Sequence, residues 1–341
     1  MNLTVTMKQL LSCLCFLLLM GCLPKEAKQE STAQKSSKTT YASKKNLSHI
    51  KVGYCTPTLD GPFYVALEDA VKNAVKAYGM QYLSTDGQGD INKQVMAVDD
   101  LLSKGIQVLV LNPLDPKALV PIVKSANEKG VMVFILDSTI EDEAPYISSV
   151  VANNQLNGEL LGLWLAEQKK ADLKIAIISG NQGNPVGREK RLGFVRGLAD
   201  GQLHGQAKTN FQIVAQGWGG WNNNGGLKAM EDILVAHPEV NTLLAENDAM
   251  ALGALKVITQ MGKSDAITVL AFDGQKEAYV AIKNGEFAVT ALNSPKILGE
   301  TMIEVVARHL NEEETARTIY TPSVLINKQK VDQYYDPKAL F

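Results

Sequence analysis

Short apolar runs alternate with longer amphipathic segments from about residue 50 to the end of the chain. Each junction between a run and a segment carries Gly, Pro, Asn or Asp, the residues that end strands and begin turns. The apolar runs predict nine strands, at residues 50–55, 80–84, 108–111, 131–136, 147–151, 174–178, 211–215, 242–245 and 268–272. Strands that alternate with helices predict a parallel α/β sheet.

The segments between these strands have the spacing of amphipathic helices. Over residues 63–78, apolar side chains recur on one helical face, and Gly79 is a typical C-terminal cap. The pattern begins again after Asn153 with a helix through Trp164. The same unit is therefore used twice, which predicts two similar doubly wound sheet domains. Such sheets bind ligands in the crevice outside the carboxyl ends of their strands.

The first residues have the pattern of an export signal. Lys8 precedes an apolar run over residues 10–20, which is too short to span a bilayer comfortably. We expect residues 1–21 to be cleaved, because the run ends in Leu-Met-Gly followed by Cys22, a pattern that resembles the bacterial lipobox. Cys22 would then carry diacylglycerol; the alternative is an ordinary secretory signal with a chance cysteine. Residues 22–49 are polar and poor in large apolar side chains, so we expect a flexible tether.

Composition narrows the class of protein. The chain has 341 residues, 34 basic and 36 acidic side chains and 45% hydrophobic residues, which suits a globular protein of two domains. The charge balance is near zero and the sequence has no long basic run, so nucleic acid is not an expected partner. Cys55 is the only cysteine beyond the N-terminal stretch, and the four histidines lack the spacing of zinc ligands. We expect no disulfide, no metal and no cofactor.

Polar and aromatic side chains stand directly after the predicted strands. They fall in residues 56–64, 112–113, 137–138, 181–188, 217–221, 247–248 and 273–274. Carboxylates, amides and a guanidinium group match the hydroxyls of a polyhydroxylated ligand, and aromatic faces can cover its C–H surface. These positions therefore predict a binding site for a sugar-like molecule.

Each of these residues has a simpler interpretation when taken alone. Asn112 before Pro113 and Asp273 before Gly274 are common turn pairs. Asn247 is equally suited to cap a helix, and Arg188 lies among charged residues where a solvated ion pair is usual. The aromatic residues are also compatible with ordinary core packing. Their joint placement at successive strand ends is what favours ligand binding.

Motifs of the common enzyme classes are missing from the sequence. It has no phosphate-binding loop, no dinucleotide fingerprint and no serine in a nucleophile elbow. Asp137 and Asp273 remain compatible with the acid and base of a glycoside hydrolase. Binding explains the many amides better, so we expect a protein that is not an enzyme.

Several motifs together resemble the periplasmic sugar-binding proteins of the ribose and galactose type, whose fold is shared by the ligand cores of lactose-repressor-like regulators. The motifs that carry the resemblance are at residues 61–64, 110–115, 135–137, 187–194, 246–254 and 271–274. By motif, the resemblance implies nine ligand contacts: Phe63, Tyr64, Asn112, Asp137, Arg188, Trp221, Asn247, Asp273 and Asn293.

The chain departs from the ribose pattern at two positions and from the galactose pattern at two others. Gly61 stands where ribose binders usually have Asn, and Ser138 where they have Arg. Asn184 and Val186 replace the His and Asp of the galactose branch. The ligand is therefore left open among monosaccharides and related polyols.

The resemblance also implies an architecture and a partner. It implies the type I periplasmic binding protein fold, with two lobes joined by a three-segment hinge that close around the ligand. The N-terminal lobe would comprise residues 50–152 and 294–321, and the C-terminal lobe residues 153–293 and 322–341. We expect an exported, membrane-anchored monomer that delivers its ligand to an ABC transporter permease; a receptor acting through a sensor kinase or chemoreceptor is the alternative.

Overall fold

The computed structural model of this chain describes residues 45–168 and 172–341. The predicted signal peptide, the predicted lipid attachment site at Cys22 and most of the predicted tether lie outside the described residues. Leu47, which falls within the predicted tether, is buried in the core of the first lobe. Across the part of the chain that the structure describes, no helix is both long and apolar enough to cross a membrane.

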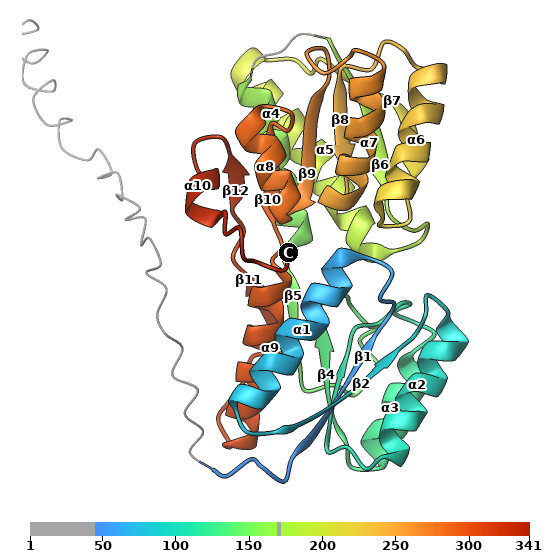
Figure 1. Cartoon of the computed structure of the whole chain (residues 1–341), viewed down its shortest axis with the longest axis vertical. Helices are drawn as coiled ribbons and strands as arrows, with labels where there is room; N and C mark the ends of the chain where they lie inside the picture. The colour runs from blue at the N-terminus through green and yellow to red at the C-terminus, as the bar shows by residue number, and fades with distance from the viewer. Residues whose placement is uncertain (1–44, 169–171) are drawn as a thin grey trace, which may run out of the picture. The chain divides into compact units, whose positions relative to one another are not determined.

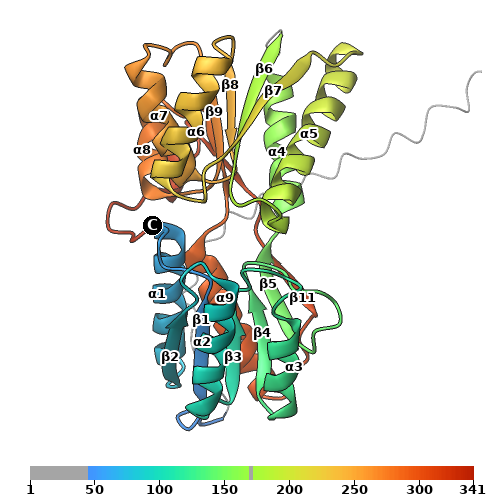
Figure 2. The same cartoon turned by 90° about the vertical axis from the view of Figure 1, so that its right-hand side faces the viewer.

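Two six-stranded sheets organise the described chain (Figures 1 and 2). In the first sheet all neighbouring strands are parallel. Its strands, in spatial order, are β11 (Thr318–Thr321), β5 (Ser148–Ala152), β4 (Met132–Leu136), β3 (Val108–Leu111), β1 (Lys51–Thr56) and β2 (Gln81–Asp86). Helices α1 (Pro62–Ala77) and α9 (Pro295–Leu310) pack on one face, and α2 (Ile91–Ser103) and α3 (Val120–Glu128) on the other.

The second sheet repeats this arrangement with one antiparallel strand at its edge. Its strands, in spatial order, are β12 (Leu325–Asn327), β10 (Val289–Leu292), β9 (Thr268–Asp273), β8 (Thr242–Ala245), β6 (Leu173–Ser179) and β7 (Phe211–Trp218). Helices α4 (Asn154–Glu167) and α5 (Pro185–Gln206) cover one face. The other face carries α6 (Asn223–Ala236), α7 (Asp248–Gln260) and α8 (Lys276–Asn284), and the short α10 (Val331–Tyr334) follows β12.

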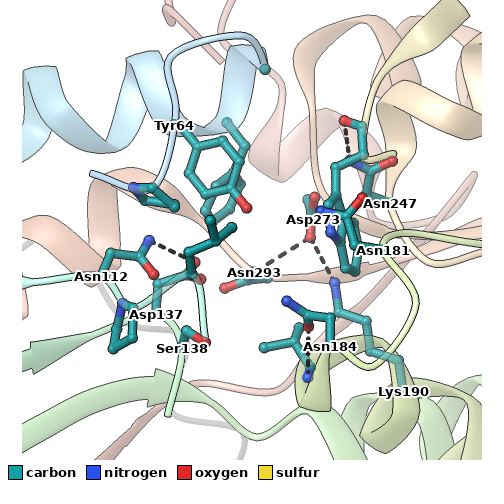
Figure 3. A pocket seen from close by; sticks show the side chains of 17 residues that line it. Tyr64, Asn112, Asp137, Ser138, Asn181, Asn184, Lys190, Asn247, Asp273 and Asn293 are labelled. Atoms are coloured by element: carbon teal, nitrogen blue, oxygen red, sulfur yellow. Dashed lines mark hydrogen bonds and ion pairs between the residues drawn. The ribbon is translucent and has the colours of Figure 1, made fainter. Parts of the chain in front are cut away.

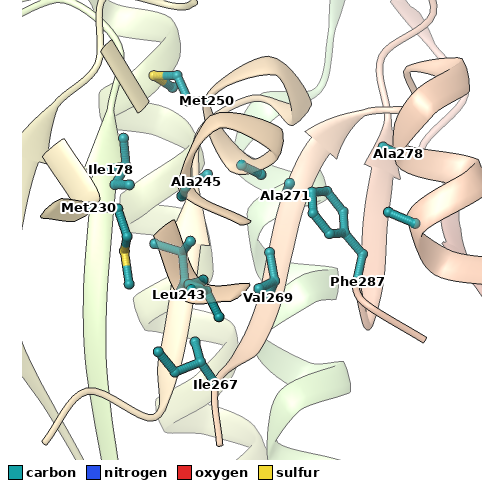
Figure 4. Close-up of a cluster of buried hydrophobic side chains, with 14 of the residues drawn as sticks. Ile178, Met230, Leu243, Ala245, Met250, Ile267, Val269, Ala271, Ala278 and Phe287 are labelled. Carbon is teal, nitrogen blue, oxygen red and sulfur yellow. The ribbon is translucent and has the colours of Figure 1, made fainter. Parts of the chain in front are cut away.

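Successive residues of each central strand enter opposite cores, because side chains alternate across a sheet. Leu243 and Ala245 of β8 pack beneath α6 and α7, whereas Leu244 packs toward α4 and α5. Figure 4 shows the first of these two cores, in which Val269 and Phe287 lie among the same cluster. Burial on both faces explains why these strands appear as continuous apolar runs in the sequence.

The chain passes between the sheets three times: from β5 to α4, from β10 to α9 and from β11 to β12. We propose the lobe boundaries at these crossings, close to residues 152, 293 and 321. We call the first sheet with its helices the N-terminal lobe and the second the C-terminal lobe.

The predicted fold class is confirmed: two α/β lobes, each a predominantly parallel sheet with helices on both faces. All nine predicted strands are present, and those at Val108–Leu111 and Thr242–Ala245 have the predicted bounds. The strands β10, β11 and β12 are not among the nine. Thr290 interrupts the apolar residues of β10, β11 begins and ends with Thr, and β12 has only three residues, so none of them forms a continuous apolar run.

Helices α4 and α5 approach each other backbone to backbone through facing glycines. A Cβ atom on Gly162 would lie 2.2 Å from the carbonyl oxygen of Phe194, and one on Gly193 would lie 2.1 Å from that of Gln155. Real Cβ atoms do not approach so closely, so any side chain at these positions must push the helices apart.

We therefore expect Gly193→Ala to lower the free energy of unfolding by roughly 1–3 kcal/mol, the usual cost of overpacking. The matched control is Gly205→Ala in the same helix, where an added Cβ meets nothing within 4 Å. That change should raise stability by up to about 1 kcal/mol, because Ala favours the helix. Urea denaturation followed by circular dichroism measures both, and equal effects of the two variants would contradict the packing argument.

Candidate functional site

One pocket is lined by residues that follow strands of both sheets (Figure 3). It encloses a cavity of about 50 Å³, which is room for more than one water molecule. Its 17 lining residues are Pro57, Gly61, Phe63, Tyr64, Asn112, Pro113, Leu114, Asp137, Ser138, Asn181, Asn184, Val186, Lys190, Trp221, Asn247, Asp273 and Asn293. The loop before α1 and the loop before α6 lie close together at the pocket: a Cβ on Gly61 would lie 3.8 Å from the carbonyl oxygen of Trp221.

The N-terminal lobe contributes a carboxylate held by an amide. Asn112 Nδ2 donates a hydrogen bond to Asp137 Oδ2 at 3.0 Å. Asn112 is itself held by the fully buried Gln94, whose Nε2 donates to the Asn112 carbonyl oxygen at 2.8 Å and whose Oε1 accepts from the Leu114 amide at 2.9 Å. Burial raises the pKa of Asp137 to about 6, against the opposing effects of Asn112 and Lys190. Gln94 thus fixes the loop after β3, and Asn112 in that loop holds the carboxylate of Asp137, which follows β4, at the pocket.

The C-terminal lobe contributes a buried ion pair. Lys190 Nζ lies 3.2 Å from Asp273 Oδ1 and donates to the carbonyl oxygen of Glu246 at 2.8 Å. The ammonium group also lies 4.9 Å from the centre of the Phe272 ring, within range of a cation–π interaction. Asn293 Nδ2 donates to the same carboxylate at 3.3 Å. Burial raises the pKa of Asp273, and the positive charge of Lys190 opposes that rise.

The backbone that carries Asp273 is held by a second, fully buried carboxylate, Asp248. Its Oδ2 accepts from the amides of Gly274 and Gln275, both at 2.7 Å, and its Oδ1 accepts from the Thr290 hydroxyl at 2.8 Å. These bonds fix the turn in which Asp273 has a φ of 114°. Burial raises the pKa of Asp248 well above its ordinary value, and the negative charge of the neighbouring Asp273 adds to this rise.

The indole ring of Trp221 packs against Gly180, which has no side chain to occupy that space. A Cβ on Gly180 would lie 1.9 Å from the indole ring, so no other residue fits there. Gly180 is held in place because its amide donates to Glu246 Oε2 at 2.8 Å, and Glu246 also forms an ion pair with Arg191. Asn247 Nδ2 donates to the Trp221 carbonyl oxygen at 3.1 Å. Glu246 therefore helps to position both the ring, through Gly180, and Lys190, through its carbonyl oxygen.

Three non-glycine residues of the pocket adopt left-handed backbone angles. The φ values are 67° for Asp137, 63° for Trp221 and 114° for Asp273. Such conformations cost of the order of 1–3 kcal/mol each and persist where the surrounding structure enforces them, commonly at functional sites. Three buried polar atoms in the lining, Ser138 Oγ, Trp221 Nε1 and Asn293 Oδ1, also have no hydrogen-bond partner within the protein. The pocket thus keeps donors and acceptors free for a ligand.

Eight of the nine residues expected to contact ligand line this one pocket, and Arg188 does not. Arg188 is exposed, whereas Lys190 of the same helix is buried in the lining. The helical period explains the difference. Lys190 lies four residues after the lining residue Val186 and so shares its face, while position 188 points away. That spacing is a signal in the sequence that identifies Lys190.

Asn247 combines the two roles that the sequence left open. Its Oδ1 accepts from the Met250 amide at 2.9 Å and caps α7, while the residue also lines the pocket. Asp248 belongs to the predicted strand-end set at residues 247–248, but the sequence assigned it no partner. Its bonds to Gly274, Gln275 and Thr290 join segments that are distant in the chain, and no local pattern indicates them.

Comparison with known proteins places the chain in a family. The model of the periplasmic binding protein domain matches residues 52–314. The ribose import binding protein RbsB of Bacillus subtilis (strain 168) is 31% identical over 277 residues, which cover 81% of this chain and 87% of the relative. The D-apiose import binding protein of Paraburkholderia graminis is 26% identical over 268 residues, covering 78% and 83%.

A solved structure is similar to this chain in fold and covers most of its length. An ABC transporter solute-binding protein from Mycobacterium smegmatis, crystallised with bound glycerol, is 33% identical and superposes with a TM-score of 0.78. The similarity covers 85% of this chain and 98% of that structure. These relatives are binding proteins and not enzymes. Because the family model matches residues 52–314, most of the chain, this chain belongs to the periplasmic binding protein family.

Proposed function

We propose that this chain is an extracytoplasmic solute-binding lipoprotein that captures a monosaccharide or related polyol and delivers it to the permease of an ABC transporter. The observation that carries this proposal is the single pocket in which polar groups of both lobes, three of them without protein partners, lie beside Trp221, Phe63 and Tyr64. Ribose, apiose and glycerol, named for the relatives, are all small, neutral and rich in hydroxyl groups.

The charges in the lining favour a neutral ligand. Asp137 accepts its hydrogen bond from an amide, and the only basic group in the lining, Lys190, is already bonded to Asp273 and Glu246. Free carboxylate lone pairs accept hydrogen bonds from hydroxyl groups, and the unpaired Asn293 Oδ1 adds another acceptor. The aromatic residues can cover the C–H surface of the same molecule.

Capture by closure follows from the placement of the pocket between segments of two lobes. Ligand bound to both lobes stabilises the closed arrangement by its differential affinity for the two states. The permease would then recognise the closed pair of lobe surfaces. In this proposal Lys190 replaces Arg188 as the basic group of the site, and the other eight expected contacts are kept.

The central test is a thermal-shift screen of the purified protein against pentoses, hexoses, tetritols, glycerol and cyclitols. Ligand that binds only the native state stabilises it by about 2.7 kcal/mol at 100 times Kd, so at least one compound should raise the midpoint by several degrees. Matched sugar acids and amino acids serve as controls and should give no shift. A response confined to amino acids or sugar acids, or none from any hydroxylated compound, would refute the proposal.

The ligand contacts are tested by Asp137→Asn paired with Arg188→Ala. Asparagine still accepts the hydrogen bond from Asn112 but loses the charge that strengthens bonds to ligand hydroxyls. We expect roughly a tenfold or greater loss of affinity by calorimetry, since hydrogen bonds to charged groups contribute about 1.5–3 kcal/mol. Arg188→Ala should change affinity less than twofold, because this exposed side chain lies outside the lining. A larger loss in Arg188→Ala than in Asp137→Asn would reverse the assignment.

The lipid anchor is tested by Cys22→Ser. Without the thiol no diacylglycerol can be attached, and the protein should move from the membrane fraction to the soluble extracytoplasmic fraction. Mass spectrometry of the wild-type N-terminus should find the lipid on Cys22. Ligand affinity, measured in parallel, should not change. Retention of Cys22→Ser in the membrane fraction after residues 1–21 have been removed, as judged by the mass of the protein, would show that the anchor is wrongly assigned.

A further inference from the structure

The segment after α10 contacts both lobes, and it is not one of the three crossings described above. Tyr335 packs against the core of the C-terminal lobe and lies under Lys283, whose Nζ is 4.7 Å from the ring centre. Lys276 Nζ, at the start of α8, donates to the carbonyl oxygen of Ala339 at 2.8 Å. The segment is therefore held by the C-terminal lobe as far as residue 339.

Two residues later the chain packs against the other lobe. The ring of Phe341 meets that of Phe63 edge to face, with centroids 5.7 Å apart and planes at 85°, and it joins the core cluster of the N-terminal lobe. Phe63 lines the pocket and is 8% exposed. Leu340, between the two attachments, is 63% exposed and packs against neither core. Figure 1 shows this end of the chain beside the start of α1, between the two lobes.

We propose that residues 336–341 form a strap that ties the C-terminal lobe to Phe63, and that Phe341 is a positioning residue for ligand binding. The proposal rests on closure of the lobes around a ligand, as in the function proposed above. Only Leu340 separates the two attachments, and three residues span at most about 10 Å. Opening of the lobes beyond that reach must break the contact of Phe341 with Phe63 or that of Lys276 with Ala339.

The strap has two consequences for binding. Phe341 holds the ring of Phe63 without itself being part of the pocket lining, so the aromatic wall is already in place when ligand arrives, and pre-organisation of this kind raises affinity. The strap also adds the contact between Phe341 and Phe63, which forms only when the lobes are close together. This contact shifts the population toward the closed state. Both effects slow the release of ligand.

The first experiment compares Phe341→Ala with Leu340→Ala, a neighbour that touches neither core. An aromatic pair contributes about 0.5–1.5 kcal/mol beyond its buried area, so Phe341→Ala should weaken binding about threefold to tenfold, mainly through faster dissociation. Leu340→Ala should stay within twofold of wild type. Phe341→Tyr keeps the edge-to-face ring and should restore most of the affinity. Calorimetry and stopped-flow measurements with the ligand found by the thermal-shift screen give these values.

A second measurement needs no ligand and separates this inference from the proposed function. Spin labels at Lys129→Cys and Lys256→Cys, exposed positions on the two lobes, report the distance between the lobes in a Cys22→Ser background. Phe341→Ala and Lys276→Met should both shift the distances of the ligand-free protein toward longer values, and Leu340→Ala should not. Unchanged distances, or tighter ligand binding in Phe341→Ala, would overturn the strap even if the ligand itself is confirmed.

Discussion

The ion pair between Lys190 and Asp273 is the interaction on which the geometry of the pocket depends. A buried ammonium group costs several kcal/mol unless acceptors replace its water. Asp273 and the Glu246 carbonyl oxygen supply those acceptors, and the ring of Phe272 lies beside the charge. Because Lys190 comes from α5 and Asp273 from the end of β9, the pair joins helix to sheet at the position where the ligand is proposed to bind.

The position of Lys190 is determined by residues that touch no ligand. A Cβ on Gly158 of α4 would lie 2.3 Å from the carbonyl oxygen of Lys190, so the close packing of the two helices acts directly on this residue. Its neighbour Arg191 pairs with Glu246, whose other oxygen holds the amide of Gly180 beneath Trp221. The cation and the aromatic face of the pocket are thus parts of one connected network.

The sequence predicted the fold and most of the pocket because both follow from local pattern and one general property of parallel sheets. The carboxyl ends of parallel strands meet at one edge, so polar residues after successive strands, such as Asn112 and Asp137, must come together. The resemblance implied Arg188, which lies outside the lining, and did not indicate Lys190, because motif matching takes no account of which helical face a residue occupies.

Two other features depend on tertiary contacts that no local rule reports. Asp248 holds the turn after Asp273 from across the lobe, and Phe341 reaches Phe63 from the opposite end of the chain. Each joins residues that are distant in sequence, and each acts on a residue of the pocket rather than on the ligand. The residues that line the pocket were therefore largely predictable, whereas those that position them were not.

The balance of charge in the lining explains why a neutral polyol fits better than an acid. One lysine and two aspartates give a net charge of −1, and the lysine is already paired. A ligand carboxylate or phosphate would meet Asp137 with no free cation to offset the repulsion, and closure would increase the penalty by excluding water. Hydroxyl groups carry no charge and donate to the same carboxylate. Burial raises the pKa of Asp137 only to about 6, so this group is still mostly ionised at neutral pH and can accept hydrogen bonds from such donors.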